Sequence, residues 1–313
     1  MEADLVLLQR AVTVILNISL CVLVGSSTAT LWLRSARSTW AASLLPSLRA
    51  VALTTTGVAI SAYVAILWVE AASMAEVPLS EALPAVRSVV TATHYGFAWM
   101  IGAAALVVTA TVCSLGERLQ ASGIASTVRV AAIALLLYSR SMVSHAGAGG
   151  NFTWAVAVDW VHLVLISVWV GEVLIAGLLV LRRLPDDESA SRADCAAYIE
   201  ALSHSATISL VGIFVTGGIS TLRVVEIPQD LVGNPYGTAL IIKVGFVLCA
   251  AALGGFNRFV VMPSLLRSLK QPGRAERGAR GRFARILQVE AAFLILVILA
   301  AAVLTSTSPP MAP

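Results

Sequence analysis

The chain has 313 residues, of which 58% are hydrophobic and only 12% are charged, and its mean hydropathy is +0.88. A water-soluble domain of this length does not carry so much apolar sequence, so the composition predicts a membrane protein. The 21 Lys and Arg residues exceed the 17 Asp and Glu residues, but they lie in particular loops and form no single basic face, which argues against a nucleic-acid partner.

The apolar residues are gathered into runs of about twenty, the length that crosses a hydrocarbon core as an α-helix. A transmembrane barrel would instead alternate apolar and polar residues. The sequence therefore predicts an all-α, polytopic transmembrane bundle that forms one domain over residues 1–313. We expect about eight spanning helices. Their approximate ranges are 10–31, 51–70, 88–114, 126–144, 155–181, 205–223, 237–262 and 284–305.

Basic residues mark every second loop of this arrangement. The loop after the expected span 237–262 carries Arg267, Lys270 and further arginines, whereas the loop after span 51–70 carries Glu76 and Glu81. The positive-inside rule assigns the basic loops to the cytoplasm. An even number of spans then places both termini on the periplasmic or extracellular side, with membrane lipid around the bundle.

Two similar tetrapeptides hint at an internal repeat. Residues 95–98 (YGFA) lie near the start of the third expected span, and residues 236–239 (YGTA) lie at the start of the seventh. Four spans per half would make this a parallel 4+4 repeat. A match this short also arises by chance in apolar sequence, so both interpretations stay open.

Ionisable side chains are costly inside a bilayer and usually face the interior of a bundle, which makes them the best functional candidates. His94 and His162 are each expected about two turns, or about 10 Å, inside the outer ends of their spans. His145 is expected at the outer end of span four. Asp159 precedes His162 by three residues and Met142 precedes His145 by three, so each pair shares a helix face.

Three imidazoles, a carboxylate and a thioether in one layer are a candidate transition-metal site, because imidazole suits copper or zinc and thioether sulfur favours Cu(I). Asp159 is expected either to bind the metal or to orient His162 through its second ring nitrogen. The alternatives are that the histidines only hydrogen-bond at the headgroup level and that Met142 is packing.

Three further charged residues lie within expected spans: Glu172, Lys243 and Glu290. Lys243 is expected near the depth of His162, so an ion pair with Asp159 competes with the metal interpretation. Glu172 and Glu290 lie deeper, and together with Lys243 they are candidates for an ion or proton path. Arg140 lies near the expected site, and its charge opposes a bound cation.

The four cysteines contain no CxxC pair, which argues against a thiolate metal site.

The order of several short motifs resembles that of the copper resistance protein D (CopD-like) family of bacterial inner-membrane proteins. The resemblance covers residues 90–265 best. Its motifs are Ser144-His145-Ala146, Asp159 with His162, Trp169-Val170-Gly171, Thr216-Gly217, Tyr236-Gly237, Lys243 and Asn257-Arg258 with Pro263. Two positions depart from the family pattern: Glu172 stands where a second glycine is common, and His204-Ser205 replaces an aromatic-serine pair.

The resemblance implies a copper-handling protein of the inner membrane that moves copper inward, often with a separate periplasmic copper-binding partner. No nucleophile paired with a base stands out in the sequence, so no enzymatic activity is expected. By position the resemblance implies His145, Asp159 and His162 as the copper site. No GxxxxGK[ST] motif is present, so transport would follow a gradient or be coupled to protons. The alternatives are a haem b electron carrier, with His94 and His162 as axial ligands, and a non-transporting subunit in metal delivery.

Overall fold

The computed structural model describes residues 2–115, 122–183, 185, 188–224, 234–270 and 274–307. Within these ranges every regular element is helical, and eight helices are long and apolar enough to cross a membrane. The all-α class and the number of spans are therefore confirmed. The α-helices are α1 (Glu2–Arg34), α2 (Thr39–Ala75), α3 (Leu83–Ala92), α4 (His94–Ser114), α6 (Gly123–Met142), α7 (Trp154–Leu178), α8 (Ser189–Val224), α9 (Pro235–Phe256), α10 (Met262–Lys270) and α11 (Arg274–Thr305).

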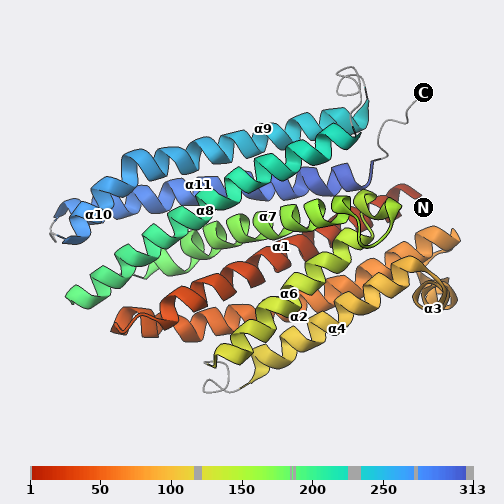
Figure 1. The fold of residues 1–313 in the computed structure, drawn as a ribbon, viewed down its shortest axis with the longest axis horizontal. Helices are drawn as coiled ribbons and strands as arrows, with labels where there is room; N and C mark the ends of the chain where they lie inside the picture. The colour runs from red at the N-terminus through yellow and green to blue at the C-terminus, as the bar shows by residue number, and fades with distance from the viewer. Residues whose placement is uncertain are drawn as a thin grey trace.

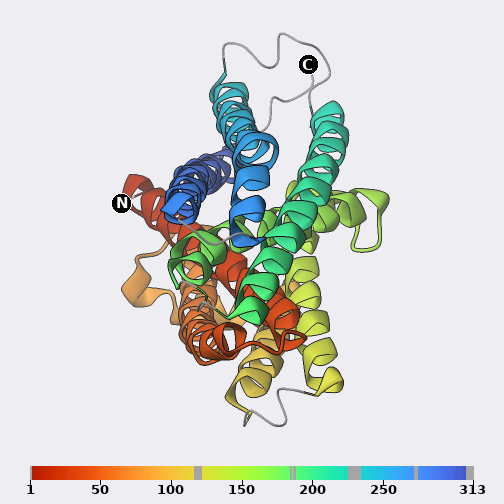
Figure 2. The ribbon, with the colours of Figure 1, turned by 90° about the vertical axis from the view of Figure 1, so that its left-hand side faces the viewer.

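The helices form three layers, with α1 and α7 in the middle (Figure 1). On one side lie α2, α4 and α6, and on the other lie α8, α9 and α11, as the view along the bundle also shows (Figure 2). The contacts agree with this picture, because α7 packs against α1 and α6 as well as against α8 and α11. α7 therefore lies at the centre of the bundle.

The start of α1 and the end of α11 lie at the same end of the bundle (Figure 1). Arg10 in α1 donates a hydrogen bond from Nε to the hydroxyl oxygen of Ser306, just after α11, at 2.7 Å. The two ends of the described chain therefore lie together at one end face of the bundle. Which side of the membrane this face occupies stays a prediction from the charge of the loops.

Several helices extend well beyond the expected spans. The span expected at 205–223 is the second half of α8, which begins at Ser189, and the span expected at 51–70 lies inside α2. Hydropathy marks only the part of a helix that crosses lipid, whereas backbone hydrogen bonding continues the helix into the polar region through alanine-rich sequence.

The third expected span, 88–114, is wrong in one respect that matters for the site. The helix is interrupted at Thr93, whose extended backbone ends α3 and whose side chain caps α4 by accepting a hydrogen bond from Gly96 N at 3.0 Å. His94 is consequently the first residue of α4. An apolar pattern does not reveal such a break, because the Thr93 hydroxyl replaces the missing helical partner locally.

Helices α1 and α7 touch at a pair of glycines. A Cβ atom added to Gly25 would lie 2.1 Å from the backbone of Gly171, and one added to Gly171 would lie 1.9 Å from the carbonyl oxygen of Cys21. Only glycine permits this approach of two backbones, as at other small-residue crossings of membrane helices. The crossing fixes where the side chains that follow it on α7 lie.

The tetrapeptides behind the suggested repeat occupy equivalent places in their helices. Each follows an N-cap residue by two positions, and each glycine donates its backbone N–H to the cap side chain, Thr93 for Gly96 and Asn234 for Gly237. A capped helix start is a common local feature, so the 4+4 repeat stays a prediction.

Candidate functional site

A cavity of about 470 Å³ lies at the end of the bundle that holds both ends of the described chain. Residues of α1, α2, α4, α6, α7, α9 and α11 and of the segment after α6 line it. Four of the residues singled out from the sequence line this cavity together, namely His145, Asp159, His162 and Lys243. We call it the outer cavity.

His162 is held between α7 and α8 in a defined orientation. Its Nδ1 lies 2.8 Å from the hydroxyl oxygen of Thr216, and that hydroxyl lies 2.7 Å from the carbonyl oxygen of Gly212. A hydroxyl has one proton, and donating it to Gly212 leaves the oxygen to accept from Nδ1–H. The ring proton is then on Nδ1, so Nε2 keeps the lone pair that a metal ion or proton needs.

Gly217, next to Thr216, makes room for the imidazole. A Cβ atom at this position would lie 3.3 Å from Cε1 of His162, closer than ordinary van der Waals contact. The pair Thr216-Gly217 therefore shapes the place of the ring: the first residue orients it and the second admits it.

Asp159 lies one turn before His162 on α7 and lines the same cavity, as their spacing predicts. Its Oδ2 accepts a hydrogen bond from the Ser144 hydroxyl at 3.1 Å. No direct hydrogen bond joins Asp159 to His162 in the described chain, so Thr216 orients the imidazole where Asp159 was expected to. His145 follows Ser144, is exposed, and lies at the wall of the cavity.

Lys243 of α9 lies within electrostatic range of both Asp159 and His162. Across the described ranges it makes no hydrogen bond, and no carboxylate oxygen lies within 4 Å of its ammonium group. Asp159 and Lys243 thus line the same cavity without closing an ion pair. The remaining charged residues of the lining are Arg10, Arg140 and Glu70, and Glu70 lies within electrostatic range of Arg140.

Two predicted members of the site lie elsewhere. His94 does not line the outer cavity; it is exposed at the start of α4, where its Nε2 lies 2.5 Å from the side-chain oxygen of Asn151. The predicted depth of two turns is wrong because α4 starts at this residue. Met142 is also outside the lining, with 3% of its surface exposed, and it packs at the end of α6.

Within the described residues, no three His, Cys, Asp or Glu side chains converge closely enough to hold a metal ion. His145, Asp159 and His162 line the outer cavity without forming such a group. The haem alternative requires His94 and His162 to face a common space, and only His162 lines the cavity.

Glu172 is buried beneath the outer cavity with 1% of its surface exposed, just past the crossing of α1 and α7. Its Oε1 accepts a hydrogen bond from the hydroxyl of Ser205 at 2.9 Å, and Oε2 has no partner among the described residues. Ser205 is the serine of the His204-Ser205 pair and matches the family pattern at its position, so Glu172, which departs from the pattern, is bonded to a residue that keeps it.

Glu290, 2% exposed, lines a second cavity of about 150 Å³ between α7, α8, α9 and α11. Its Oε1 accepts a hydrogen bond from Nε1 of Trp169 at 3.1 Å. Asn257 and Arg258 line the same cavity from the π-helical turn Asn257–Val261. Arg258 donates to the carbonyl and hydroxyl oxygens of Ser203 at 2.8 and 2.6 Å, which ties this turn to α8.

Sequence reasoning missed Cys21 and Ser167, which line the inner part of the outer cavity. The lack of a CxxC pair argues against a thiolate metal site, but Cys21 of α1 lines the same cavity as His162. In the sequence Thr216 is only part of a Thr-Gly motif, and its hydrogen bond to His162 becomes visible only because α8 packs beside α7.

Two family models match long segments of the chain. The family described as Copper resistance protein D matches residues 196–304, and the family described as Copper resistance protein D-like, N-terminal domain, matches residues 3–154. The N-terminal match covers α1 and the layer of α2, α4 and α6. The other match covers most of the layer of α8, α9 and α11.

Two curated relatives carry related descriptions. Copper resistance protein D of Pseudomonas syringae pv. tomato is 29% identical over 223 residues, which are 70% of this chain and 71% of that protein. Copper transport protein CutJ of Bacillus subtilis (strain 168) is 26% identical over 180 residues, 57% of this chain and 30% of that protein. Together with the eight membrane-capable helices, these matches show that the chain is a multi-pass membrane protein of the CopD-like family, related to copper resistance and copper transport proteins.

Proposed function

We propose that the protein carries copper ions through the bundle, and that the outer cavity is where the ion is first bound. The observation that supports this most is the orientation of His162, whose Nε2 lone pair is left available by the hydrogen bond from Nδ1 to Thr216. Imidazole nitrogen is a good ligand for copper, and an outer hydrogen bond on the second nitrogen strengthens it.

The other potential copper ligands of the cavity suit an ion that binds transiently and moves on. His145 is exposed at the wall and Asp159 lies nearby, while Cys21 lies further in and offers sulfur, the softer donor that Cu(I) prefers. Donors spread over a wide space bind an ion in steps and release it again, as conduction through a membrane requires. A resident metal would instead need a closed set of ligands.

The basic residue Lys243 gives this binding a dependence on protons. A cation at Asp159 and a charged ammonium group at Lys243 repel each other across the cavity, so the ion binds best when Lys243 releases its proton or moves away. We propose that copper binding and the charge on Lys243 exclude one another, which couples ion movement to protons.

An inward path is offered by the second cavity. On α7, Ser167 lines the outer cavity and Trp169 lines the second; on α11, Val297 lines the outer cavity and Glu290 the second. The two positions of α11 are seven residues apart, which corresponds to about 10 Å of helix. Glu172 and Glu290 are the acidic groups at this depth, and we propose that they receive the ion or its accompanying proton.

The orientation proposed here puts the outer cavity at the periplasmic face of the inner membrane, because the basic loops lie at the other end. His145, exposed at the wall of the cavity, is then placed to take copper from a separate periplasmic copper-binding protein. In this role the protein acts as a transporter and not as an enzyme.

The proposal is tested with purified protein in sealed proteoliposomes, by following the uptake of copper with and without a pH gradient. We expect uptake in protein-containing vesicles that Asp159→Asn lowers, with Asp194→Asn, a change in α8 outside the cavity, as the matched control. Uptake equal to that of empty vesicles would contradict transport. An absorption spectrum of the same protein separates the alternative function, since a Soret band would identify haem.

A further inference from the structure

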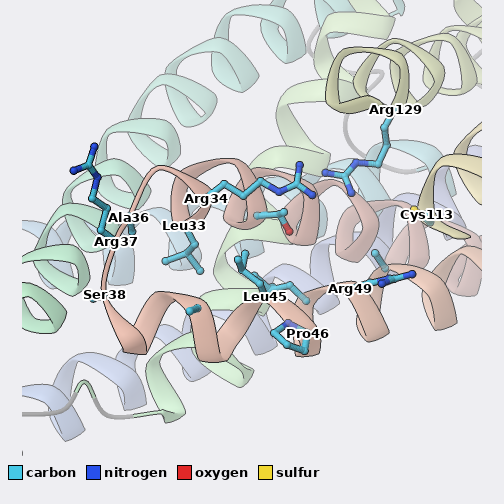
Figure 3. A pocket seen from close by; sticks show the side chains of 14 residues that line it. Leu33, Arg34, Ala36, Arg37, Ser38, Leu45, Pro46, Arg49, Cys113 and Arg129 are labelled. Atoms are coloured by element: carbon cyan, nitrogen blue, oxygen red, sulfur yellow. The ribbon is translucent and has the colours of Figure 1, made fainter. Parts of the chain in front are cut away.

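Another large cavity, distinct from the two described above, lies at the opposite end of the bundle from the outer cavity. It has a volume of about 480 Å³ and lies where α1 ends, α2 begins, α4 ends and α6 begins. Four arginines line it, and we call it the arginine cavity: Arg34, Arg37, Arg49 and Arg129 (Figure 3). None of the other described residues of its lining is acidic.

Arg129 is the most informative of the four. It is only 5% exposed, it lines the cavity, and within the described chain its Nε and Nη2 have no hydrogen-bond partner. Two buried guanidinium nitrogens without partners are costly, since each orphaned donor loses its bond to water. The three planar donor groups of a guanidinium match the oxygens of a phosphate group.

A second arginine reaches toward Arg129 from another helix. Figure 3 shows the side chain of Arg34, at the end of α1, extending toward the Arg129 guanidinium, while Arg37 extends away from it. The charges of Arg34 and Arg129 act on each other. Arg34 also donates to the hydroxyl of Ser126 at 3.0 Å, which holds it beside α6. Like charges held together in this way are stabilised by an anion between them.

The remaining lining is apolar and includes Leu33, Leu45, Pro46, Leu48 and Ala52. A phospholipid combines the two properties of this cavity, because its phosphate requires cationic donors and its acyl chains require an apolar wall. The loops at this end carry most of the basic residues, which is the face where anionic lipid headgroups are attracted.

We propose that the arginine cavity binds an anionic phosphate group through Arg129 and Arg34, with an anionic phospholipid headgroup as the source that its lining favours. A free phosphate is the other source of the same chemistry. This site is separate from the copper path, and the proposal does not depend on transport.

The test uses the full-length protein, freed of lipid in a neutral detergent and without copper. Binding of a short-chain phosphatidylglycerol, of phosphatidylcholine with the same chains, and of inorganic phosphate is measured for wild-type protein and for Arg129→Gln. We expect phosphatidylglycerol to bind more tightly than phosphatidylcholine, and Arg129→Gln to weaken its binding at least about tenfold, the loss of one or more charged hydrogen bonds. Arg267→Gln, an exposed arginine of α10 outside the cavity, should bind as wild type does.

The phosphate arm identifies the source. If inorganic phosphate displaces phosphatidylglycerol and binds more weakly to Arg129→Gln, the ligand is a soluble phosphate. If inorganic phosphate does not displace phosphatidylglycerol, the ligand is a lipid. If Arg129→Gln does not fold, Arg34→Gln carries the same expectation. The proposal would be overturned if the folded variant bound each probe as tightly as wild-type protein does. It would also be overturned if wild-type protein bound neither phosphatidylglycerol nor phosphate.

Discussion

The hydroxyl oxygen of Thr216 lies 2.8 Å from Nδ1 of His162 and orients the imidazole of α7 from the neighbouring helix α8. Because the Thr216 hydroxyl lies 2.7 Å from the carbonyl oxygen of Gly212 and donates to it, the hydroxyl oxygen is left as an acceptor. The contact therefore selects the ring form whose Nε2 is free to bind an ion.

Replacing Thr216 by Val removes this acceptor and keeps the shape of the side chain. We expect Thr216→Val to weaken copper binding by about tenfold or more, the usual effect of losing a group that orients a metal ligand. Thr216→Ser should retain most of the affinity. Titration of the purified protein with copper measures the effect. Thr221→Val, which removes a hydroxyl bonded to the backbone one turn further on, is the control; an equal loss in both variants would contradict the orienting role.

Two adjacent glycines provide a steric test of the same contact. A Cβ atom at Gly217 would lie 3.3 Å from Cε1 of His162, whereas one at Gly218 would meet no atom within 4 Å. Gly217→Ala is expected to displace the ring and lower copper affinity by up to about tenfold, and Gly218→Ala to leave it unchanged. Copper affinity that is the same in both variants would show that the position of this ring does not matter.

Lys243→Met tests the competition between the ammonium group and the ion. Removing a positive charge from the outer cavity should raise copper affinity by about tenfold, or about 1.4 kcal/mol, and reduce the dependence of binding on pH. Affinity measured across a range of pH in wild-type and variant protein gives both values. Lys270→Met, at the opposite end of the bundle, serves as the control. A lower affinity in Lys243→Met would argue that Lys243 keeps Asp159 in its binding form.

The crossing of α1 and α7 is expected to be sensitive to a single methyl group. Gly171→Ala would place a Cβ atom 1.9 Å from the carbonyl oxygen of Cys21, so the helices must separate. We expect the free energy of unfolding to fall by about 1–3 kcal/mol or more, the cost of overpacking. Thermal unfolding in detergent measures it, with Gly57→Ala as the control, because a Cβ atom there meets nothing within 4 Å. Unchanged stability of Gly171→Ala would contradict the close approach.

The fold could be predicted from hydropathy because lipid requires long apolar helices, and all eight spans were found in this way. The break at Thr93 could not, because one side-chain hydrogen bond creates it inside a continuous apolar run.

Part of the candidate site was also visible in the sequence. The spacing of Asp159 and His162 on one helix was enough to place both in one cavity. Cys21 and Thr216 come to the same region from other helices, and only helix packing reveals such neighbours. In the sequence Cys21 is a lone cysteine and Thr216 is part of a Thr-Gly pair. Neither pattern indicates by itself which residues of other helices lie nearby.

Copper bound per chain is the measurement that tests the central claim most directly, made by elemental analysis of purified wild-type protein and of His162→Ala, His145→Ala and His94→Ala. The account predicts that His162→Ala binds clearly less copper, that His145→Ala shows a smaller loss, and that His94→Ala, outside the cavity, matches wild type. Wild-type amounts of copper in both His162→Ala and His145→Ala would contradict the outer cavity as the copper site.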